Sequence, residues 1–324
     1  MHPLVMLLIE SLSCNNQERP PVWLMRQAGR YLPQYQKVRK DHSLLEMFHN
    51  SDVITEVTLQ PVDILGVDAA ILFSDILTVL DGLGVEYDFQ PGPKVNFQGF
   101  APKENAYAHI EKAITQLKRE LKVPLIGFAG GPITVMKYLL EEEKKMMICD
   151  EAQFEALFNT VLEETIAYLK VQENAGVDVI QVFDTWASTL PPYYFHKYVV
   201  RPLKRIVQEM RVPVILFCKG NPLPLVECAP ACISVDWSQD LAQLRKQIPH
   251  TIALQGNLDP MILYGSKETI RYHAETLLDQ MAGDPGYIFN LGHGMLPDIP
   301  VENVRTLIEI VQARPALHEL SHSS

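Results

Sequence analysis

The sequence predicts an α/β protein, a (β/α)8 TIM barrel built as a single domain. Eight short runs rich in Val, Ile, Leu and Phe recur along the 324 residues, and segments with helical spacing and charged faces lie between most of them. Fully apolar short runs are typical of buried parallel strands, and eight is the strand number of such a barrel. No G-x-G-x-x-G motif follows the first run. That absence disfavours the main alternative, a doubly wound open sheet that binds a dinucleotide.

The eight apolar runs are the expected barrel strands. They span Val22–Met25, Ala69–Phe73, Pro124–Phe128, Val179–Phe183, Val214–Phe217, Ile233–Val235, Ile252–Leu254 and Tyr287–Asn290. Two segments between them carry helix start and stop signals. One is Ser51–Leu65, for which Ser51 is the expected N-cap, and the other is Glu151–Ala175, which ends at Gly176.

The two ends of the chain are expected to lie outside the barrel proper. One domain is predicted to cover residues 1–324, with a short helical segment at 1–19 and a polar tail at 314–324. The stretch Leu4–Ile9 is apolar, but it lacks a basic region before it and is too short to span a bilayer. An amphipathic helix is therefore expected there. No low-complexity tract or long polar linker marks a domain boundary.

Charge and cysteine content exclude several classes of function. A net charge of -11 disfavours a nucleic-acid binder or a protein of anionic membrane surfaces, because both need a basic footprint. An acidic small molecule is still compatible with this charge, because a few arginines can make one pocket positive. Five cysteines without a C-x-x-C pair fit a reducing cytoplasm. Cys228 and Cys232 are expected to be buried apolar residues rather than metal ligands.

Polar residues follow the predicted strands at the point where each strand ends. In a barrel of this kind the chemistry lies at the C-terminal ends of the strands, so these residues are the candidates for a site. They are Arg26 and Arg30, Asp75, Gly130 and Gly131, Asp184 and Thr185, Lys219, Asp236, Asn257 with Asp259, and His293.

The first two of these positions suggest anion binding. Arg26 and Arg30 carry rigid forks that match the oxygens of a carboxylate or phosphate, although a surface salt-bridge pair is the alternative. Gly29 favours the first interpretation because it lets the backbone approach a ligand closely. Asp75 stands among apolar residues, where a carboxylate needs hydrogen-bond donors or its pKa rises. Ring N–H groups of a ligand, a helix N-cap and an ion pair with either arginine remain alternative partners.

Two further positions are less specific. In GFAGGPITVMKYL the double glycine and the proline mark a tight turn into a helix, and Tyr138 falls near its second turn. No G-K-[ST] ending makes this a phosphate loop, and a Tyr at such spacing is more often part of a core than catalytic. His293 lies between Gly292 and Gly294, where it either meets a ligand or fixes the loop. The helix after it is expected to start near Pro300.

Six blocks of the sequence, in order, resemble the signature blocks of the uroporphyrinogen decarboxylase family. They are PVWLMRQAGRYLPQY, DAAILFSDIL, GFAGGPITVMKYL, IQVFDTWAS, QGNLDP and NLGHGMLPDIPVENV, and the match runs from about Pro20 to Ala313. The resemblance implies one (β/α)8 barrel, usually assembled as a homodimer whose two clefts face each other. The chain departs from the family pattern in a shortened stretch at 88–108, in LEEEKKMM at 140–147, and at Ser188.

The resemblance also implies roles for individual residues. The substrate segment of the family falls on Arg26, Gln27, Ala28, Gly29 and Arg30, and the two arginines would meet the substrate's propionate and acetate groups. Asp75 would accept hydrogen bonds from the pyrrole N–H groups and stabilise positive charge on a protonated ring. Tyr138, Thr185 and His293 would contact the substrate. Asp75 and Arg26 are the residues implied to be catalytic.

The reaction implied by the resemblance belongs to haem and porphyrin biosynthesis. Four acetate groups of uroporphyrinogen III would be lost as CO2 to give coproporphyrinogen III. No cofactor and no metal are expected, because a protonated pyrrole makes the substrate its own electron sink. Either Arg26 or a carboxyl group of the substrate could donate the proton, and an ordinary arginine is a poor acid.

Two other functions would leave different features in the sequence. A zinc-dependent methyltransferase on the same barrel would be expected to show H-x-C after a late strand, but Leu216 stands two residues before Cys218. A porphyrinogen carrier without turnover would be expected to lose Asp75 or the arginines, and all three are present. Both features favour the decarboxylase.

Overall fold

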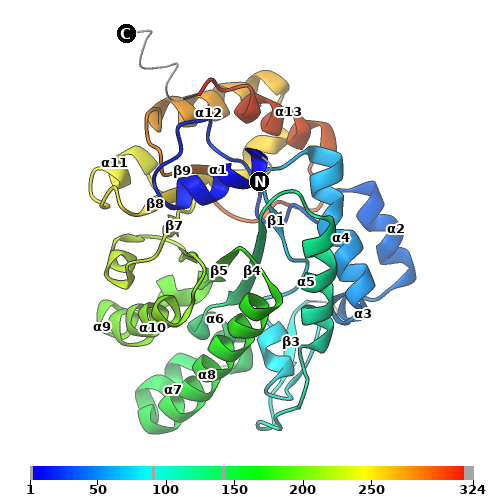
Figure 1. Cartoon of the computed structure of the whole chain (residues 1–324). Helices are drawn as coiled ribbons and strands as arrows, with labels where there is room; N and C mark the ends of the chain where they lie inside the picture. The colour runs from blue at the N-terminus through cyan, green and yellow to red at the C-terminus, as the bar shows by residue number, and fades with distance from the viewer. Residues whose placement is uncertain (1–2, 90–91, 141–142, 317–324) are drawn as a thin grey trace.

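A curled parallel sheet is the framework of the computed structural model, which describes residues 3–89, 92–140 and 143–316 (Figure 1). Seven strands lie in the order β1-β4-β5-β6-β7-β8-β9, and every neighbouring pair is parallel. Their bounds are β1 Ala70–Ile71, β4 Leu125–Gly130, β5 Val179–Phe183, β6 Val214–Phe217, β7 Cys232–Ser234, β8 Ala253–Leu258 and β9 Tyr287–Leu291. The C-terminal ends of all seven strands therefore lie at one end of the sheet.

Seven of the eight predicted runs form these strands, and the first run does not. Within Val22–Met25, only Val22 pairs, through an isolated parallel bridge to Phe289. The prediction of a closed eight-stranded barrel is therefore corrected to a TIM-like curled sheet of seven strands. Side chains compete for the donors of this segment: the amide of Val22 donates to Asp68 at 2.8 Å and that of Met25 to Asn290 at 3.0 Å, so they are not free for a strand ladder.

Helices cover the outer face of the sheet (Figure 1). The α-helices are α1 Pro3–Leu12, α2 Pro33–Asp41, α3 Leu44–His49, α4 Ser51–Leu65, α5 Ala108–Glu120, α6 Pro132–Leu139, α7 Glu143–Cys149, α8 Glu151–Ala175, α9 Pro192–Phe195, α10 Arg201–Glu209, α11 Leu241–Arg245, α12 Lys267–Gln280 and α13 Val301–Gln312. Short 3-10 turns are η1 Thr78–Asp81, η2 Thr185–Thr189, η4 Leu223–Cys228 and η5 Pro260–Tyr264, and η3 His196–Val200 is a π turn. No described helix is long and apolar enough to cross a membrane.

The two predicted helices have the expected bounds, with one correction. Helix α8 ends at Gly176, whose φ of 113° is the left-handed conformation that suits glycine. Helix α4 is capped by Asn50 rather than by Ser51, because the Asn50 side chain accepts from the amides of Asp52 and Val53. Ser51 is instead the first helical residue. The last helix begins directly after Pro300, as predicted.

The N-terminal helix closes the bottom of the sheet. Leu8 and Leu12 of α1 belong to the same buried cluster as side chains near the N-terminal ends of the strands, including Val179 and Ala253. This confirms a helix in the predicted segment 1–19. Because α1 covers the N-terminal ends of the strands, a ligand is expected at the opposite end, among the loops that follow the strands.

A polar layer crosses the otherwise apolar interior. Trp23 donates from Nε1 to Gln255 Oε1 at 2.9 Å. The Gln255 amide in turn donates to Gln181 Oε1 at 3.1 Å and to Ser234 Oγ at 3.0 Å. All four side chains are buried. They link the first segment of the chain to β5, β7 and β8.

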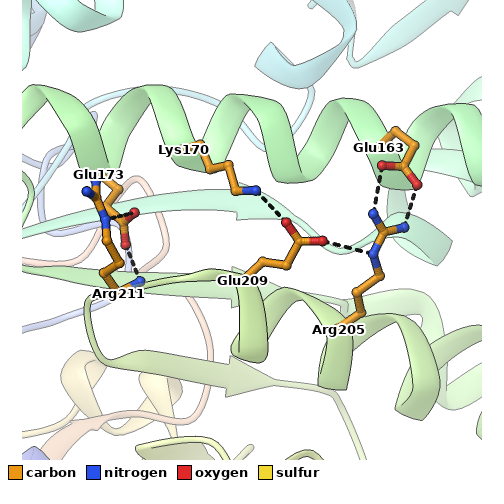
Figure 2. A network of polar contacts seen from close by, with 6 residues as sticks. All are labelled: Glu163, Lys170, Glu173, Arg205, Glu209 and Arg211. Carbon is orange, nitrogen blue, oxygen red and sulfur yellow. Dashed lines mark hydrogen bonds and ion pairs between the residues drawn. The ribbon is translucent and has the colours of Figure 1, made fainter.

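A network of ion pairs joins α8 to the next layer on the outside of the molecule (Figure 2). Its members are Glu163, Lys170, Glu173, Arg205, Glu209 and Arg211. Arg205 bonds both Glu163 and Glu209, and Glu209 also pairs with Lys170. Glu173 is buried and accepts from Arg211 Nε at 2.7 Å and from the Val212 amide at 3.0 Å. The network fixes α10 and the start of β6 against α8.

Several remaining expectations concern loops and the chain end. An antiparallel strand pair that the sequence did not predict, β2 Glu86–Asp88 with β3 Lys94–Asn96, reaches into the stretch 88–108. Residues 90–91, 141–142 and 317–324 lie outside the described residues, so the polar tail is described only at 314–316. Cys228 and Cys232 are buried, as expected.

Candidate active site

The loops after the strands bring charged side chains together at the C-terminal end of the sheet. The positive charge of Arg26 acts on both Asp75 and His293: it opposes the rise that burial causes in the pKa of Asp75, and with Lys219 it adds to the fall that burial causes in the pKa of His293. These four side chains come from the first segment and from the loops after β1, β6 and β9. The structure thus brings together residues that the sequence places almost 270 positions apart.

The side chain of Arg26 packs against Gly294, the residue that follows His293. The Arg26 backbone has a φ of 62°, and its exposed side chain lies across Gly294. A Cβ atom on Gly294 would stand 2.4 Å from Arg26 Cδ and 2.7 Å from Nε. The Met295 amide also donates to Met25 O at 3.0 Å. Gly294 therefore leaves the space in which the guanidinium reaches the site.

The rest of the RQAGR segment supports Arg26 in different ways. The side chain of Gln27 is buried, accepts from the Leu24 amide at 3.0 Å and donates to Ala69 O at 3.0 Å. Gln27 therefore fixes the turn to the start of β1. Ala28 and Gly29 are half-buried beside it.

Arg30 lies away from Asp75, on the rim. It lines a surface depression of about 290 Å³ with Arg39, Lys40 and Pro297. Arg39 and Lys40 belong to α2, and Pro297 to the loop that carries His293. The two arginines of the R-x3-R motif therefore face different places, one at the centre of the site and one at its basic edge.

Asp75 occupies the turn between β1 and η1. Its Oδ1 accepts from the Leu77 amide at 2.9 Å, which orients the carboxylate. Burial raises its pKa to about 6, while the Leu77 amide and the Arg26 charge act in the opposite direction. Asp75 is half-buried as a residue. The helix N-cap that the sequence offered as an alternative is not formed, because the residue before η1 is Leu77, and among the described residues Arg26 acts on Asp75 through its charge without an ion pair.

Asp184 is a second acid, which the sequence noted after a strand but did not assign to the site. It is fully buried, and its Oδ1 accepts from the amide of Thr134 at 2.8 Å and from the hydroxyl at 2.7 Å. Its Oδ2 has no hydrogen-bond partner among the described residues. Burial raises the pKa of Asp184 to about 6 against these Thr134 bonds. The double glycine after β4 was the available signal, because a Cβ on Gly131 would stand 2.6 Å from Oδ2.

His293 is enclosed by aromatic rings. Its imidazole meets the Trp237 ring edge-on at 5.6 Å between centres and the Phe217 ring at 6.3 Å. Burial, followed by the charges of Arg26 and Lys219, lowers its pKa. The imidazole is therefore neutral at pH 7 and has one ring nitrogen to donate and one to accept.

Thr185 and Tyr138 lie at the edges of this arrangement. Thr185 is half-buried at the first position of η2, directly after Asp184. Tyr138 is half-buried in α6 and packs against the main hydrophobic core. This packing of Tyr138 agrees with the core role that the sequence favoured for it.

The other polar residues after the strands hold loops in place. Asp236 is buried and accepts from the amides of Ser238 at 2.6 Å and of Gly220. Asn257 donates to Asp236 O at 2.9 Å. Asp259 accepts from the Met261 amide at 2.9 Å. These residues position the loops that carry Lys219 and His293.

The site combines positive charge with acids that titrate near neutral pH. Cationic Arg26 and Lys219 suit an anionic ligand, and carboxyl groups with a pKa near 6 suit proton transfer or charge stabilisation at pH 7. Fold and charged residues together define a TIM-like α/β protein with a candidate site for an anionic ligand at the C-terminal ends of its strands.

Comparison with known sequences identifies the family. Residues 6–314 match the family model described as uroporphyrinogen decarboxylase (URO-D). The uroporphyrinogen decarboxylase of Protochlamydia amoebophila is 41% identical, over 95% of this chain and 91% of that protein. The enzyme of that name from Geobacter metallireducens is 41% identical, over 91% and 94%. The chain belongs to the uroporphyrinogen decarboxylase family.

Solved structures with the same fold include methyltransferases. A methyltransferase from Methanosarcina mazei superposes with a TM-score of 0.83 at 21% identity, covering 95% of this chain and 98% of that one. A B12-independent methionine synthase from Shewanella sp. W3-18-1 has a TM-score of 0.62 at 13% identity, covering 95% and 97%. At these identities the likeness concerns the fold alone.

Proposed function

We propose that this chain catalyses the decarboxylation of uroporphyrinogen in porphyrin biosynthesis, as a carboxy-lyase. Four acetate side chains of uroporphyrinogen III would each lose CO2 and become methyl groups, giving coproporphyrinogen III. The observation that carries the proposal is the family match over residues 6–314, together with relatives of that name at 41% identity. The acid and base groups at the C-terminal end of the sheet are consistent with it.

Carboxylate capture is assigned to the arginines. Arg26 reaches the centre of the site and would bind an acetate or propionate group of the substrate through its planar fork. Arg30 on the rim, with Arg39 and Lys40, would attract the outer carboxylates of an eightfold acidic substrate. A chain with a net charge of -11 thus presents positive charge where the substrate would enter.

Asp75 is assigned the stabilisation of the reacting ring. Its carboxylate is oriented by the Leu77 amide and would accept hydrogen bonds from the pyrrole N–H groups. Because its pKa of about 6 lies below 7, the group is mainly ionised at neutral pH and can balance positive charge on a protonated ring. Tyr138, Thr185 and His293 would add hydrogen bonds at the edge of the substrate.

The reaction needs no cofactor in this proposal. A proton adds to an electron-rich ring carbon, and the electron pair of the bond to the carboxylate then flows into the ring as CO2 leaves. A proton added to the remaining CH2 group gives the methyl group, and loss of the ring proton restores the pyrrole. The residues of this chain supply orientation and electrostatic stabilisation.

The proposal also covers the closure of the barrel, the assembly of the chain and its location. We infer that residues 21–24 complete the barrel, since Phe289 N donates to Pro21 O at 2.9 Å and Asp68 N to Val22 O at 2.8 Å. We further propose one domain per chain, a homodimer and a cytoplasmic location, on the family resemblance. Sedimentation would contradict the homodimer by showing only a species near 36.7 kDa.

The decisive experiment is anaerobic incubation with uroporphyrinogen III, oxidation of the products, and their separation by number of carboxyl groups. Products with seven to four carboxyl groups are expected. Unchanged eight-carboxylate material would contradict the proposal. If that material is bound but unchanged, the alternative of a porphyrinogen carrier is favoured.

A further inference from the structure

Three potential metal ligands converge where α3, η1 and α5 meet. His49 is the last residue of α3, Asp81 the last of η1, and His109 the second of α5. One ligand atom from each lies within 4.8 Å of the other two. The three residues are 32 and 28 positions apart in sequence, so no spacing motif announces them.

The distances are close to those of a bound ion. His49 Nε2 lies 3.0 Å from Asp81 Oδ2, and His109 Nε2 lies 4.0 Å from the same oxygen. Ligands around a tetrahedral ion with bonds near 2.0–2.1 Å stand about 3.3 Å apart. Side-chain shifts of less than about 1 Å would therefore bring the three atoms onto one ion.

The hydrogen bonds at the site leave lone pairs facing inward. His49 Nδ1 lies 2.8 Å from Leu45 O, which can only accept, so Nδ1 carries a hydrogen. Metal-bound histidines commonly make this bond, because it fixes the ring and leaves the other nitrogen to the ion. Nε2 faces Asp81 Oδ2 at 3.0 Å, so a protonated ring donates to that carboxylate, and only the neutral ring presents the Nε2 lone pair that an ion would use.

The second imidazole of the cluster has an unpaired ring nitrogen among the described residues. His109 Nε2 is buried and has no hydrogen-bond partner among the described residues. Its ring lies 4.9 Å from that of His49 between centres. Buried ring nitrogens are normally satisfied, so an unsatisfied one beside a carboxylate and a second imidazole points to a missing partner. A cation would satisfy all three groups at once.

We propose that His49, Asp81 and His109 bind one transition-metal ion of the zinc type. Two imidazole nitrogens and one carboxylate oxygen are a ligand set for such an ion. The His49 side chain is 38% exposed, against 13% for Asp81, so solvent can complete the coordination from the His49 side. The ion would fasten η1 to α3 and α5. Since η1 directly follows the turn of Asp75, the site stabilises a segment of the active site without contacting the substrate.

Binding is tested on the full-length protein after chelator treatment. One Zn²⁺ per chain is expected by calorimetric titration, and Co²⁺ in its place should give the visible absorption of a low-symmetry site. Zn²⁺ should also raise the melting temperature of the metal-free protein, because an ion that binds only the folded state stabilises it. Absence of stoichiometric binding would overturn the proposal.

Variants separate this site from surface histidines. H109A should lower Zn²⁺ affinity by more than about 100-fold, because even outer partners of metal ligands are worth about 10- to 100-fold. D81N tests the same loss without removing side-chain volume, in case H109A folds poorly. H250A removes an exposed histidine elsewhere and should bind like the unaltered chain. Equal Zn²⁺ binding by D81N and H250A would refute the site.

Discussion

Asp75 and Asp184 follow β1 and β5, the two strands that flank β4, but their surroundings give them different roles. Each follows a strand, and burial raises the pKa of each to about 6. Asp75 is half-buried and one of its oxygens accepts from the Leu77 amide, whereas Asp184 is fully buried and accepts twice from Thr134. A raised pKa alone therefore does not identify a group that meets substrate. Exposure and hydrogen-bond partners decide it.

The largest expected effect is on turnover by Asp75 variants. Replacing Asp75 with Ala should abolish measurable decarboxylation, a loss of roughly 10³-fold or more, because preorganised charge is a large term in such reactions. Unfolding measured by circular dichroism should change little. Near-normal activity of this variant would contradict the proposed role and remove the distinction between the two acids.

Asp184 variants should show the reverse pattern. Asp184→Ala leaves the Thr134 amide and hydroxyl without their acceptor and should lower the free energy of unfolding by about 2–3 kcal/mol. Denaturant unfolding measures this loss, and Asp184→Asn, which keeps one acceptor oxygen, is the matched control. If Asp184→Ala were stable but inactive, Asp184 would join Asp75 as a catalytic group.

The pH dependence of stability sharpens the same contrast. An acid with a raised folded-state pKa binds its proton more tightly when folded, so this contribution favours the folded state at low pH and is lost as the pH rises from about 4 to 6. For Asp184, a rise from 3.8 to about 6 corresponds to about 3 kcal/mol. Unfolding of the Asp184→Asn variant should have a flatter pH profile in that window. Identical profiles would show that Asp184 does not titrate there.

The pH profile of activity should follow the other acid. If ionised Asp75 is required, kcat/KM falls below a pH of about 6 and is nearly constant above it until other groups titrate. The Asp184→Asn variant should keep this acid limb. If the acid limb shifts in Asp184→Asn, the limb reports the titration of Asp184 and not that of Asp75.

Two glycine variants test the contribution of Arg26 to substrate binding, and their expected effects are smaller. Gly294→Ala should displace the flexible end of Arg26 and raise KM by about 10-fold with little loss of stability, because one charge-assisted contact is weakened. Gly292→Ala should instead destabilise the fold, since its Cβ would stand 2.2 Å from the Trp237 amide nitrogen. An unchanged KM in Gly294→Ala would show that Arg26 does not bind the substrate.

The smallest effect is expected far from the site, in the ion-pair network of Figure 2. Arg205→Ala should cost less than about 1 kcal/mol, because exposed ion pairs are worth little. Thermal unfolding at low and high salt measures it. An effect on turnover would mean that the outer layer influences the strand ends.

Alternation along the sequence predicted the α/β class and seven strands, because buried parallel strands and amphipathic helices leave local patterns. The first run forms only an isolated bridge, for a non-local reason. Asp68 and Asn290 supply acceptors to the amides of Val22 and Met25, and neither is near them in sequence.

The candidate site shows the same limit. Arg26 and Asp75 could be chosen from their positions after apolar runs. The separation of Arg30 from Asp75 and the burial of Asp184 behind Gly131 depend on loop paths that only the folded chain defines. The His49 cluster likewise has no local pattern.

The polar layer inside the sheet has a consequence for synthesis of the chain. Trp23 obtains its partner only when Gln255 has been made, 232 residues later. Contacts of such long range form late, and domains fold as units as the chain emerges from the ribosome. The N-terminal segment that bears Arg26 must therefore wait through most of translation with an apolar, unpaired surface. During that interval the nascent chain depends on protection from aggregation, and the active site is among the last regions to be completed.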